Sequence, residues 1–335
     1  MKTHRIQLIL IFLDFYISIV QSENLKKGLI FGTIGVVFVG LQPIVAILRP
    51  SAMDAYQFAA MTCLIETILF FPLMLIEIKK RDSNKKNEVD DVKLGNSILK
   101  GWKNNFWLLI FIGIIFGINQ IFFFIGYDLA GAINGSLTQK TTVFFSLIFG
   151  YLILSEKITK LQIIFSFILF LGLSIGITQF FSLFEINITI LYGVLILLLI
   201  SCLWMLGHTM TKPIFNRNEV TPIQMVFLRN ILSGFILILT YLIFFPIENF
   251  KVLFDFDNQV SFILMGAVYG SGLFCWYKTL SYLDVSKASV VFSPTPVTSA
   301  IFATIILGEV FTIAHLVGII LVIVSIIIIV RQKRS

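Results

Sequence analysis

Long apolar stretches alternate with short polar connections along almost the whole chain. A helix that crosses the hydrocarbon core of a bilayer needs about 20 mostly apolar residues. Because most connections are short, neighbouring helices must run antiparallel. The pattern predicts an all-α integral membrane protein with ten transmembrane helices, at residues 28–48, 54–78, 105–127, 132–154, 158–180, 188–211, 221–246, 259–282, 287–308 and 312–330.

Two segments depart from this pattern. Residues 79–104 are polar and of mixed charge, which predicts a flexible loop. Residues 1–27 contain a short apolar run that Asp14 interrupts, and its 15 residues, 6–20, rise only about 22 Å as a helix. This N-terminal segment resembles a signal peptide. An interfacial helix and an extension without a role stay equally open.

Composition excludes the soluble classes. Hydrophobic residues make up 58% of the chain and charged residues 13%, whereas soluble chains are about 45–50% apolar and about 25% charged. The net charge of +7 does not indicate nucleic acid, because the basic residues gather in short connections. The three cysteines lie inside apolar runs without metal-ligand or C-x-x-C spacing, so we expect neither a disulfide nor a zinc site.

The distribution of Lys and Arg predicts the orientation. Connections on one side of the ten-helix unit carry eighteen of these residues, and those on the other side carry two, Arg49 and Lys251. Cytoplasmic loops are enriched in Lys and Arg. We therefore expect a multi-pass protein of the plasma membrane, with both ends of the ten-helix unit in the cytoplasm.

The chain also repeats itself. Shifted by 153 positions, residues 113–159 fall on residues 266–312 without a gap, and both stretches end in I-L-x-E-x-x-T. Five helices per repeat is an odd number, so the second repeat must be inverted in the membrane, a common transporter architecture. The predicted organisation is an N-terminal segment 1–27, a first repeat 28–180 with the loop 79–104, and a second repeat 188–330.

The repeat motifs resemble the drug/metabolite transporter superfamily, in its EamA-type branch. In the second repeat the matching residues are Leu280, Val285, Ala288, Ser289, Pro296, Leu307-Gly308-Glu309 and Gly318, with Trp204 and Arg229 earlier. The first repeat departs from the pattern at Val143, Ser155 and Phe165, where the family has proline, glycine and glycine. The resemblance implies a ten-helix transporter with a central cavity lined by helices such as 3, 4, 8 and 9.

Two motifs have competing interpretations. Glu156 and Glu309 could be gating or coupling carboxylates, but capping of helix amides is favoured because both lie at the membrane surface. Ser293-Pro294-Thr295-Pro296 breaks the ninth helix, since each proline removes a backbone hydrogen bond. Irregular backbone at membrane depth lines a cavity or packs on protein, and the cavity role is favoured.

Ionisable residues inside the spans are the main site candidates. A charge in the hydrocarbon costs at least about 2.5–3.5 kcal/mol on insertion scales, so each is a functional hypothesis. We expect Lys140 to hold an acidic group of the substrate, and its rival role is a structural pair with Glu66. Lys278 could instead extend to the membrane surface. The predicted cavity residues are Lys140, Thr141, Thr142, Glu66, Asn119, Gln120, Arg229, Ser293, Thr295, Trp276 and Tyr277.

The inverted repeat and the absence of catalytic motifs from the sequence together predict the function. The chain has no phosphate-binding loop and no metalloprotease or serine-hydrolase motif, so we expect no enzymatic activity, catalytic residue, cofactor or metal. The favoured function is a secondary transporter, or permease, for a small and anionic metabolite, working by alternating access. An intramembrane enzyme on lipid-linked substrates and a non-transporting scaffold are the alternatives. The expected partners are the small-molecule substrate and membrane lipid, and a homodimer stays open.

Overall fold

The computed structural model describes residues 2–85, 101–155, 157–180, 187–217, 219–283 and 285–331, which are almost entirely helical. Nine described segments are long and apolar enough to cross a membrane. The elements are α1 (Lys2–Ile47), α2 (Ala55–Lys85), α4 (Phe106–Ala130), α5 (Ala132–Thr138), η1 (Gln139–Thr141), α6 (Thr142–Leu154), α7 (Lys160–Thr178), α8 (Ile188–Asn216), α9 (Pro222–Phe244), η3 (Ile247–Phe254), α10 (Phe256–Tyr282), α11 (Val285–Val291), α12 (Thr295–Phe302), η4 (Ala303–Leu307) and α13 (Ile313–Arg331).

Of the ten helices predicted from the sequence, the fourth and the ninth are each divided into shorter helical segments. The ninth consists of α11, a turn at Phe292–Pro294, α12 and the π-helical η4, as its prolines predict. The fourth is divided into α5, η1 and α6, where the sequence predicted one continuous span, 132–154. It holds no proline, but Thr138 and Thr141 donate their hydroxyls to backbone carbonyls of the preceding turn, a contact that bends helices.

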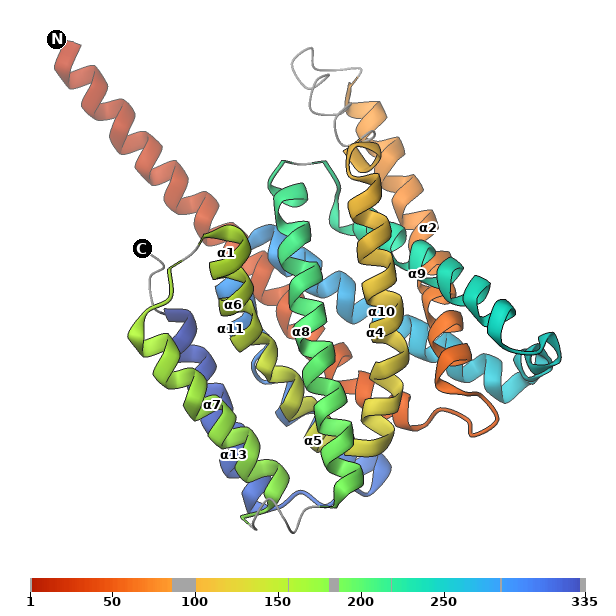
Figure 1. Ribbon diagram of the computed structural model, residues 1–335. Helices are drawn as coiled ribbons and strands as arrows, with labels where there is room; N and C mark the ends of the chain where they lie inside the picture. The colour runs from red at the N-terminus through yellow and green to blue at the C-terminus, as the bar shows by residue number, and fades with distance from the viewer. Residues whose placement is uncertain are drawn as a thin grey trace.

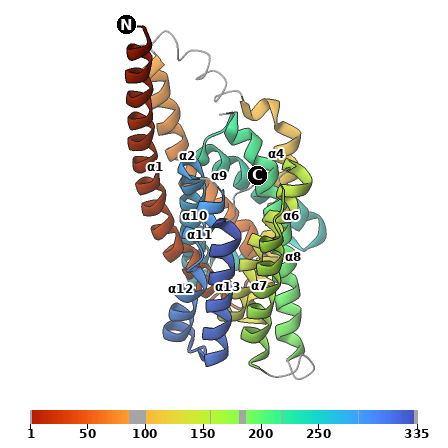
Figure 2. The ribbon, with the colours of Figure 1, turned by 90° about the vertical axis from the view of Figure 1, so that its left-hand side faces the viewer.

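Two boundaries differ from those predicted. α1 begins at Lys2, so the expected boundary at residue 27 lies inside one helix, whose N-terminal end projects beyond the bundle (Figures 1 and 2). α2 continues to Lys85, so residues 79–85 extend the helix rather than begin the loop. Residues 86–100 of the predicted loop lie outside the described residues.

The helices pair in a pattern that maps onto itself when the repeats are exchanged. α1 packs on α10 as α8 packs on α4, and α2 and α7 each pack on their own counterparts, α9 and α13. Figure 1 shows α7 and α13 together at one edge of the bundle, with α2 and α9 at the opposite edge. α5 lies below α6 in Figure 1, whereas α11 lies above α12 in Figure 2. The fourth and ninth helices therefore run in opposite directions, and the fold is two inverted five-helix repeats.

Helix capping explains the repeated Thr of the sequence motif. Thr159 and Gln162 form a reciprocal capping box at the start of α7. At the start of α13 Thr312 accepts from the backbone N–H of His315, while the His315 ring accepts from the Thr312 N–H, 3.2 Å in each case. Such boxes satisfy amides that have no partner within the helix. The shared Thr therefore starts the last helix of each repeat.

The repeated glutamate caps a different helix from the one expected. Both oxygens of the Glu309 carboxylate accept backbone N–H groups at the start of α5, from Ala132 at 2.7 Å and Ile133 at 3.0 Å. Capping is thus the role of Glu309, but across the repeats rather than on the next helix. Gly131 makes room for it: its φ is +79°, and a Cβ there would lie 3.2 Å from Glu309 Oε1. The predicted counterpart, Glu156, lies outside the described residues.

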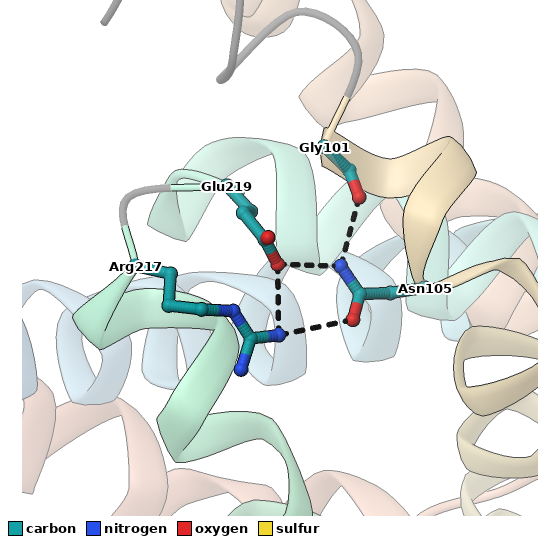
Figure 3. A network of polar contacts seen from close by, with 4 residues as sticks. All are labelled: Gly101, Asn105, Arg217 and Glu219. Atoms are coloured by element: carbon teal, nitrogen blue, oxygen red, sulfur yellow. Dashed lines mark hydrogen bonds and ion pairs between the residues drawn. The ribbon is translucent and has the colours of Figure 1, made fainter.

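A second cross-repeat contact closes the opposite, Lys-rich face (Figure 3). Asn105, just before α4, donates to Glu219 Oε2 at 2.6 Å and to the Gly101 carbonyl at 2.8 Å. Arg217 donates to Glu219 at 2.9 Å and to Asn105 at 3.2 Å. The pKa of Glu219 is lowered chiefly because Arg217 donates a hydrogen bond to it. The carboxylate therefore stays ionised near neutral pH and joins the α8–α9 connection to the first repeat.

Candidate functional site

A central cavity of about 140 Å³ lies between the two repeats. An engineered cavity of about 150 Å³ holds a benzene molecule, so the space suits a ligand with a body of that size. Both repeats contribute, through α1, η1, α6, α8, α9, α10 and α11 with the turn that follows it. The lining residues fall into a polar or charged set, Gln42, Gln139, Lys140, Thr142, His208, Arg229 and Ser289, and an apolar or aromatic set, Val39, Val143, Trp204, Met205, Tyr269, Gly272, Leu273, Trp276 and Phe292.

Lys140 stands where the two broken helices meet. It lies in η1, and its ammonium group donates to the backbone carbonyl of Phe292 at 2.8 Å. That carbonyl sits at the break between α11 and α12, where it also accepts from the Thr295 hydroxyl at 2.7 Å. An ammonium group has three donors, and Lys140 lines the cavity. Its position at both helix breaks makes it a cation of the repeat interface, available to a ligand there.

Arg229 supplies the second cation of the wall. It is 2% exposed, and its guanidinium carbon lies 4.3 Å from the ring centroid of Phe116 and 6.0 Å from that of Tyr269. Arg Nε donates to Asn230 Oδ1 at 3.4 Å. The aromatic faces orient the guanidinium group and contribute favourable cation–π energy. Two basic side chains from different repeats thus reach one cavity.

Glu66 lies behind this wall rather than beside Lys140. It is fully buried in α2 and accepts a hydrogen bond of 2.7 Å from Asn230 Nδ2. Asn230 therefore bridges Glu66 and Arg229, since its amide oxygen accepts from the arginine. In this conformation Glu66 is linked to Arg229 through Asn230 and Lys140 is bonded to Phe292, so the rival Lys140–Glu66 pair of the sequence analysis is not formed.

Several polar atoms in and near the cavity have no hydrogen-bond partner among the described residues. On the lining these are Gln139 Nε2, His208 Nδ1 and Trp276 Nε1. The first and last are obligate donors, and His208 Nδ1 can donate as well. A buried donor without an acceptor costs about 1–3 kcal/mol. Together with the two cations, these donors favour a ligand rich in acceptors.

The structure brings part of the predicted site together. Lys140, Thr142, Arg229 and Trp276 line the cavity. The remaining predicted residues are buried or half-buried around it: Thr141 and Ser293 bond backbone carbonyls of their own turns, Thr295 bonds Phe292, Glu66 bonds Asn230, and Asn119, Gln120 and Tyr277 carry polar atoms without partners in the described chain.

Sequence reasoning did not place seven further polar or aromatic lining residues in the site: Gln42, Gln139, Trp204, His208, Tyr269, Ser289 and Phe292. Position gives a signal for two of them, because Gln139 adjoins Lys140 and Phe292 precedes the S-P-T-P break. The resemblance implied a cavity along the third helix. No described residue of α4 is on the lining, since its Phe116 and Phe123 are buried in packing. Helices 1, 6 and 7 contribute lining residues that the resemblance did not imply.

Polar contacts between the repeats lie at both ends of the molecule. One end has Glu309 on α5, and Tyr241 donating to Asp54 at 3.1 Å. The other has the Asn105–Glu219 network, and Thr221 donating to Glu77 at 2.6 Å. The cavity lies between these two sets of contacts.

Comparisons with known proteins agree with this architecture. The model of a family described as "EamA-like transporter family" matches residues 26–178 and again residues 191–331. A protein of Clostridium kluyveri, described as an uncharacterized transporter, is 25% identical over 311 residues, which cover 90% of this chain and 92% of that protein. One solved structure, titled only as the crystal structure of a protein, aligns with a TM-score of 0.62 at 13% identity. The alignment covers 90% of this chain and 96% of the chain in that structure. At this identity the similarity supports the fold alone.

Proposed function

The chain belongs to the EamA-like transporter family, and from this premise we propose that it is a secondary transporter of a small organic anion. The coarser statement, that it is a multi-pass membrane transporter, follows from the family and from the apolar helices. The substrate class and the mechanism are the proposal. The observation that carries them is the pair of cations, Lys140 and Arg229, on the wall of one cavity between the repeats.

The charge of the wall supports an anionic substrate. Lys140 and Arg229 contribute two positive charges, against the single carboxylate of Glu66 behind Arg229. An excess cation at membrane depth needs a counter-charge or water. A carboxylate, sulfonate or phosphate group supplies both the charge and the acceptors that Gln139 and Trp276 lack. Trp204, Tyr269 and Phe292 contribute aromatic rings to the lining and suit a flat apolar body.

Alternating access fits the two sets of contacts between the repeats. Breaking the Glu309 contact with α5 would open one end of the cavity, and breaking the Asn105–Glu219 contact would open the other. Inverted repeats move in this way around a central site in other transporter folds. In this scheme the substrate site stays in place while the repeats rock around it.

Counterflow in proteoliposomes tests the function. Vesicles preloaded with unlabelled benzenesulfonate should take up radiolabelled benzenesulfonate faster than protein-free vesicles, and benzamide should neither enter by exchange nor compete. Benzenesulfonate suits the test because it matches the benzene-sized cavity and stays ionised at every relevant pH. A protein that exchanges no benzenesulfonate is not the proposed anion transporter. That result would favour the alternatives, an intramembrane enzyme or a non-transporting scaffold.

The orientation is also a proposal, and it rests on eighteen Lys and Arg residues against two in the connections. In a variant without the native cysteines, a single cysteine at Asp255 should react in intact cells with a membrane-impermeant thiol reagent. A single cysteine at Asn84 should react only after the cells are permeabilised. Reversal of the two results would place both ends of the ten-helix unit outside.

A further inference from the structure

Glu66 is a carboxylate that the proposed anion site does not use. Among the residues whose side chains the structure describes, it is the one Asp or Glu that is buried, with 0% exposure. One of its oxygens accepts from Asn230 at 2.7 Å. The other has no hydrogen-bond partner within the described chain. A buried ionised carboxylate with an unsatisfied oxygen is costly, so a proton on that oxygen would relieve the site.

The groups around Glu66 connect it to the cavity. From α9, Arg229 interacts with it electrostatically, and Asn230 bridges the two. From α10, Tyr269 and Tyr277 interact with both charged groups, and Gly270 packs close to the side chain. Cys63 lies on α2, the same helix as Glu66. The third helix that packs on α2 is α4. Its ionisable residues, Tyr127 and Asp128, lie near its C-terminal end. Arg229 is thus the one cation interacting with Glu66 in the described chain, and it also lines the anion site.

We propose that Glu66 is the proton-binding site that couples transport to a proton gradient, which makes the protein a proton–anion symporter. This inference rests on the proposed function, because it needs the anion to bind beside Arg229. One proton binds to the carboxylate when the anion binds, and both leave on the other side. No covalent bond other than the O–H bond forms or breaks, and a monovalent anion is then carried without net charge.

The coupling follows because one cation, Arg229, interacts with two anions, the Glu66 carboxylate and the substrate. When Glu66 is ionised, its charge competes with the substrate for Arg229 through Asn230. Protonation removes the competing charge, so the substrate anion binds more tightly. By linkage the anion must favour protonation of Glu66 by the same factor, and coupling factors of about 5–150 are typical. Proton and anion therefore favour each other on the protein, which is the condition for symport rather than exchange.

Accumulation driven by a pH gradient tests the inference. Proteoliposomes with an acidic exterior and valinomycin-clamped potential should concentrate benzenesulfonate, up to about tenfold for one pH unit at one proton per anion. Glu66→Gln, which resembles the protonated carboxyl, should keep benzenesulfonate counterflow but lose this accumulation. Glu248→Gln changes an exposed carboxyl in η3 and serves as the matched control, with accumulation as in the unaltered protein.

The outcomes separate this inference from the proposed function. Absence of counterflow by the unaltered protein contradicts the function and the coupling together. Counterflow without gradient-driven accumulation leaves the function standing and overturns the coupling. Accumulation that survives in Glu66→Gln overturns Glu66 as the proton site.

A second measurement covers the case in which Glu66→Gln does not fold. The detergent-solubilised, unaltered protein should take up protons from a weakly buffered solution when benzenesulfonate is added. A pH-sensitive dye detects this uptake. Uptake should vanish on acidification, where Glu66 is already protonated. No uptake at any pH contradicts the coupling without the use of any variant.

Discussion

Replacement of Lys140 by methionine should reduce benzenesulfonate counterflow by about 100-fold while the protein stays folded. Methionine keeps most of the length of the side chain but removes the ammonium group at the meeting point of the broken helices. A hydrogen bond to a charged group contributes up to about 3 kcal/mol, which corresponds to about 100-fold or slightly more in binding. Counterflow rates at saturating and limiting benzenesulfonate measure the loss.

A double variant tests whether Lys140 acts on the anion or on Glu66. Addition of Glu66→Ala to Lys140→Ala should not restore transport, because Glu66 bonds Asn230 rather than Lys140 in the structure. Recovery in the double variant would identify a structural ion pair. Lys278→Met is the matched control: this lysine lies in α10 near Phe274 and is not on the cavity lining. Its counterflow should stay within about twofold of that of the unaltered protein.

Replacement of Gly318 by leucine should destabilise the fold by about 3 kcal/mol or more. A Cβ at Gly318 would lie 2.6 Å from the Gly172 carbonyl oxygen and 3.1 Å from the Gly176 nitrogen. These are backbone atoms of α7 and cannot rotate away, so α7 and α13 must separate. Overpacking of a close interface costs about 1–3 kcal/mol and occasionally more. Unfolding of the purified protein in denaturing detergent, followed by Trp fluorescence, measures the change.

Gly117→Ala provides the comparison for this effect. A Cβ at Gly117 meets its nearest side chains at 3.6 Å, an ordinary van der Waals distance. Alanine also favours a helix over glycine by about 1 kcal/mol. Its stability should therefore equal or exceed that of the unaltered protein. Equal stability of Gly318→Leu and Gly117→Ala would contradict the direct backbone contact between α7 and α13.

The repeat shows what a pattern can and cannot predict. The shared Thr159 and Thr312 were visible as a motif, and their capping role is local, because each bonds residues of its own first turn. Glu309 was equally visible, but it caps a helix 176–177 residues away in sequence. Local hydrogen bonds depend on spacing in the chain, whereas the distant one depends on how the repeats pack.

The breaks in the helices show the same division. Proline at positions 294 and 296 predicts the break in the ninth helix, since the missing N–H groups are a property of the residue type. The break at Gln139–Thr141 has no such residue and appears only in the three-dimensional structure. It lies opposite the Phe292 carbonyl, where Lys140 bonds the other repeat, so the tertiary contact accompanies an irregularity that the sequence does not announce.

By itself the sequence determined the membrane environment, the apolar helices and the two homologous repeats, because hydrophobic length, charge distribution and repetition are properties of the chain. It also identified Lys140, Arg229 and Glu66, since charged residues inside apolar stretches need no structure to be noticed. Only the tertiary structure decided their partners. It placed Lys140 and Arg229 on one cavity and Glu66 behind Asn230, because these neighbours come from helices whose relative rotation and depth depend on packing across the whole bundle.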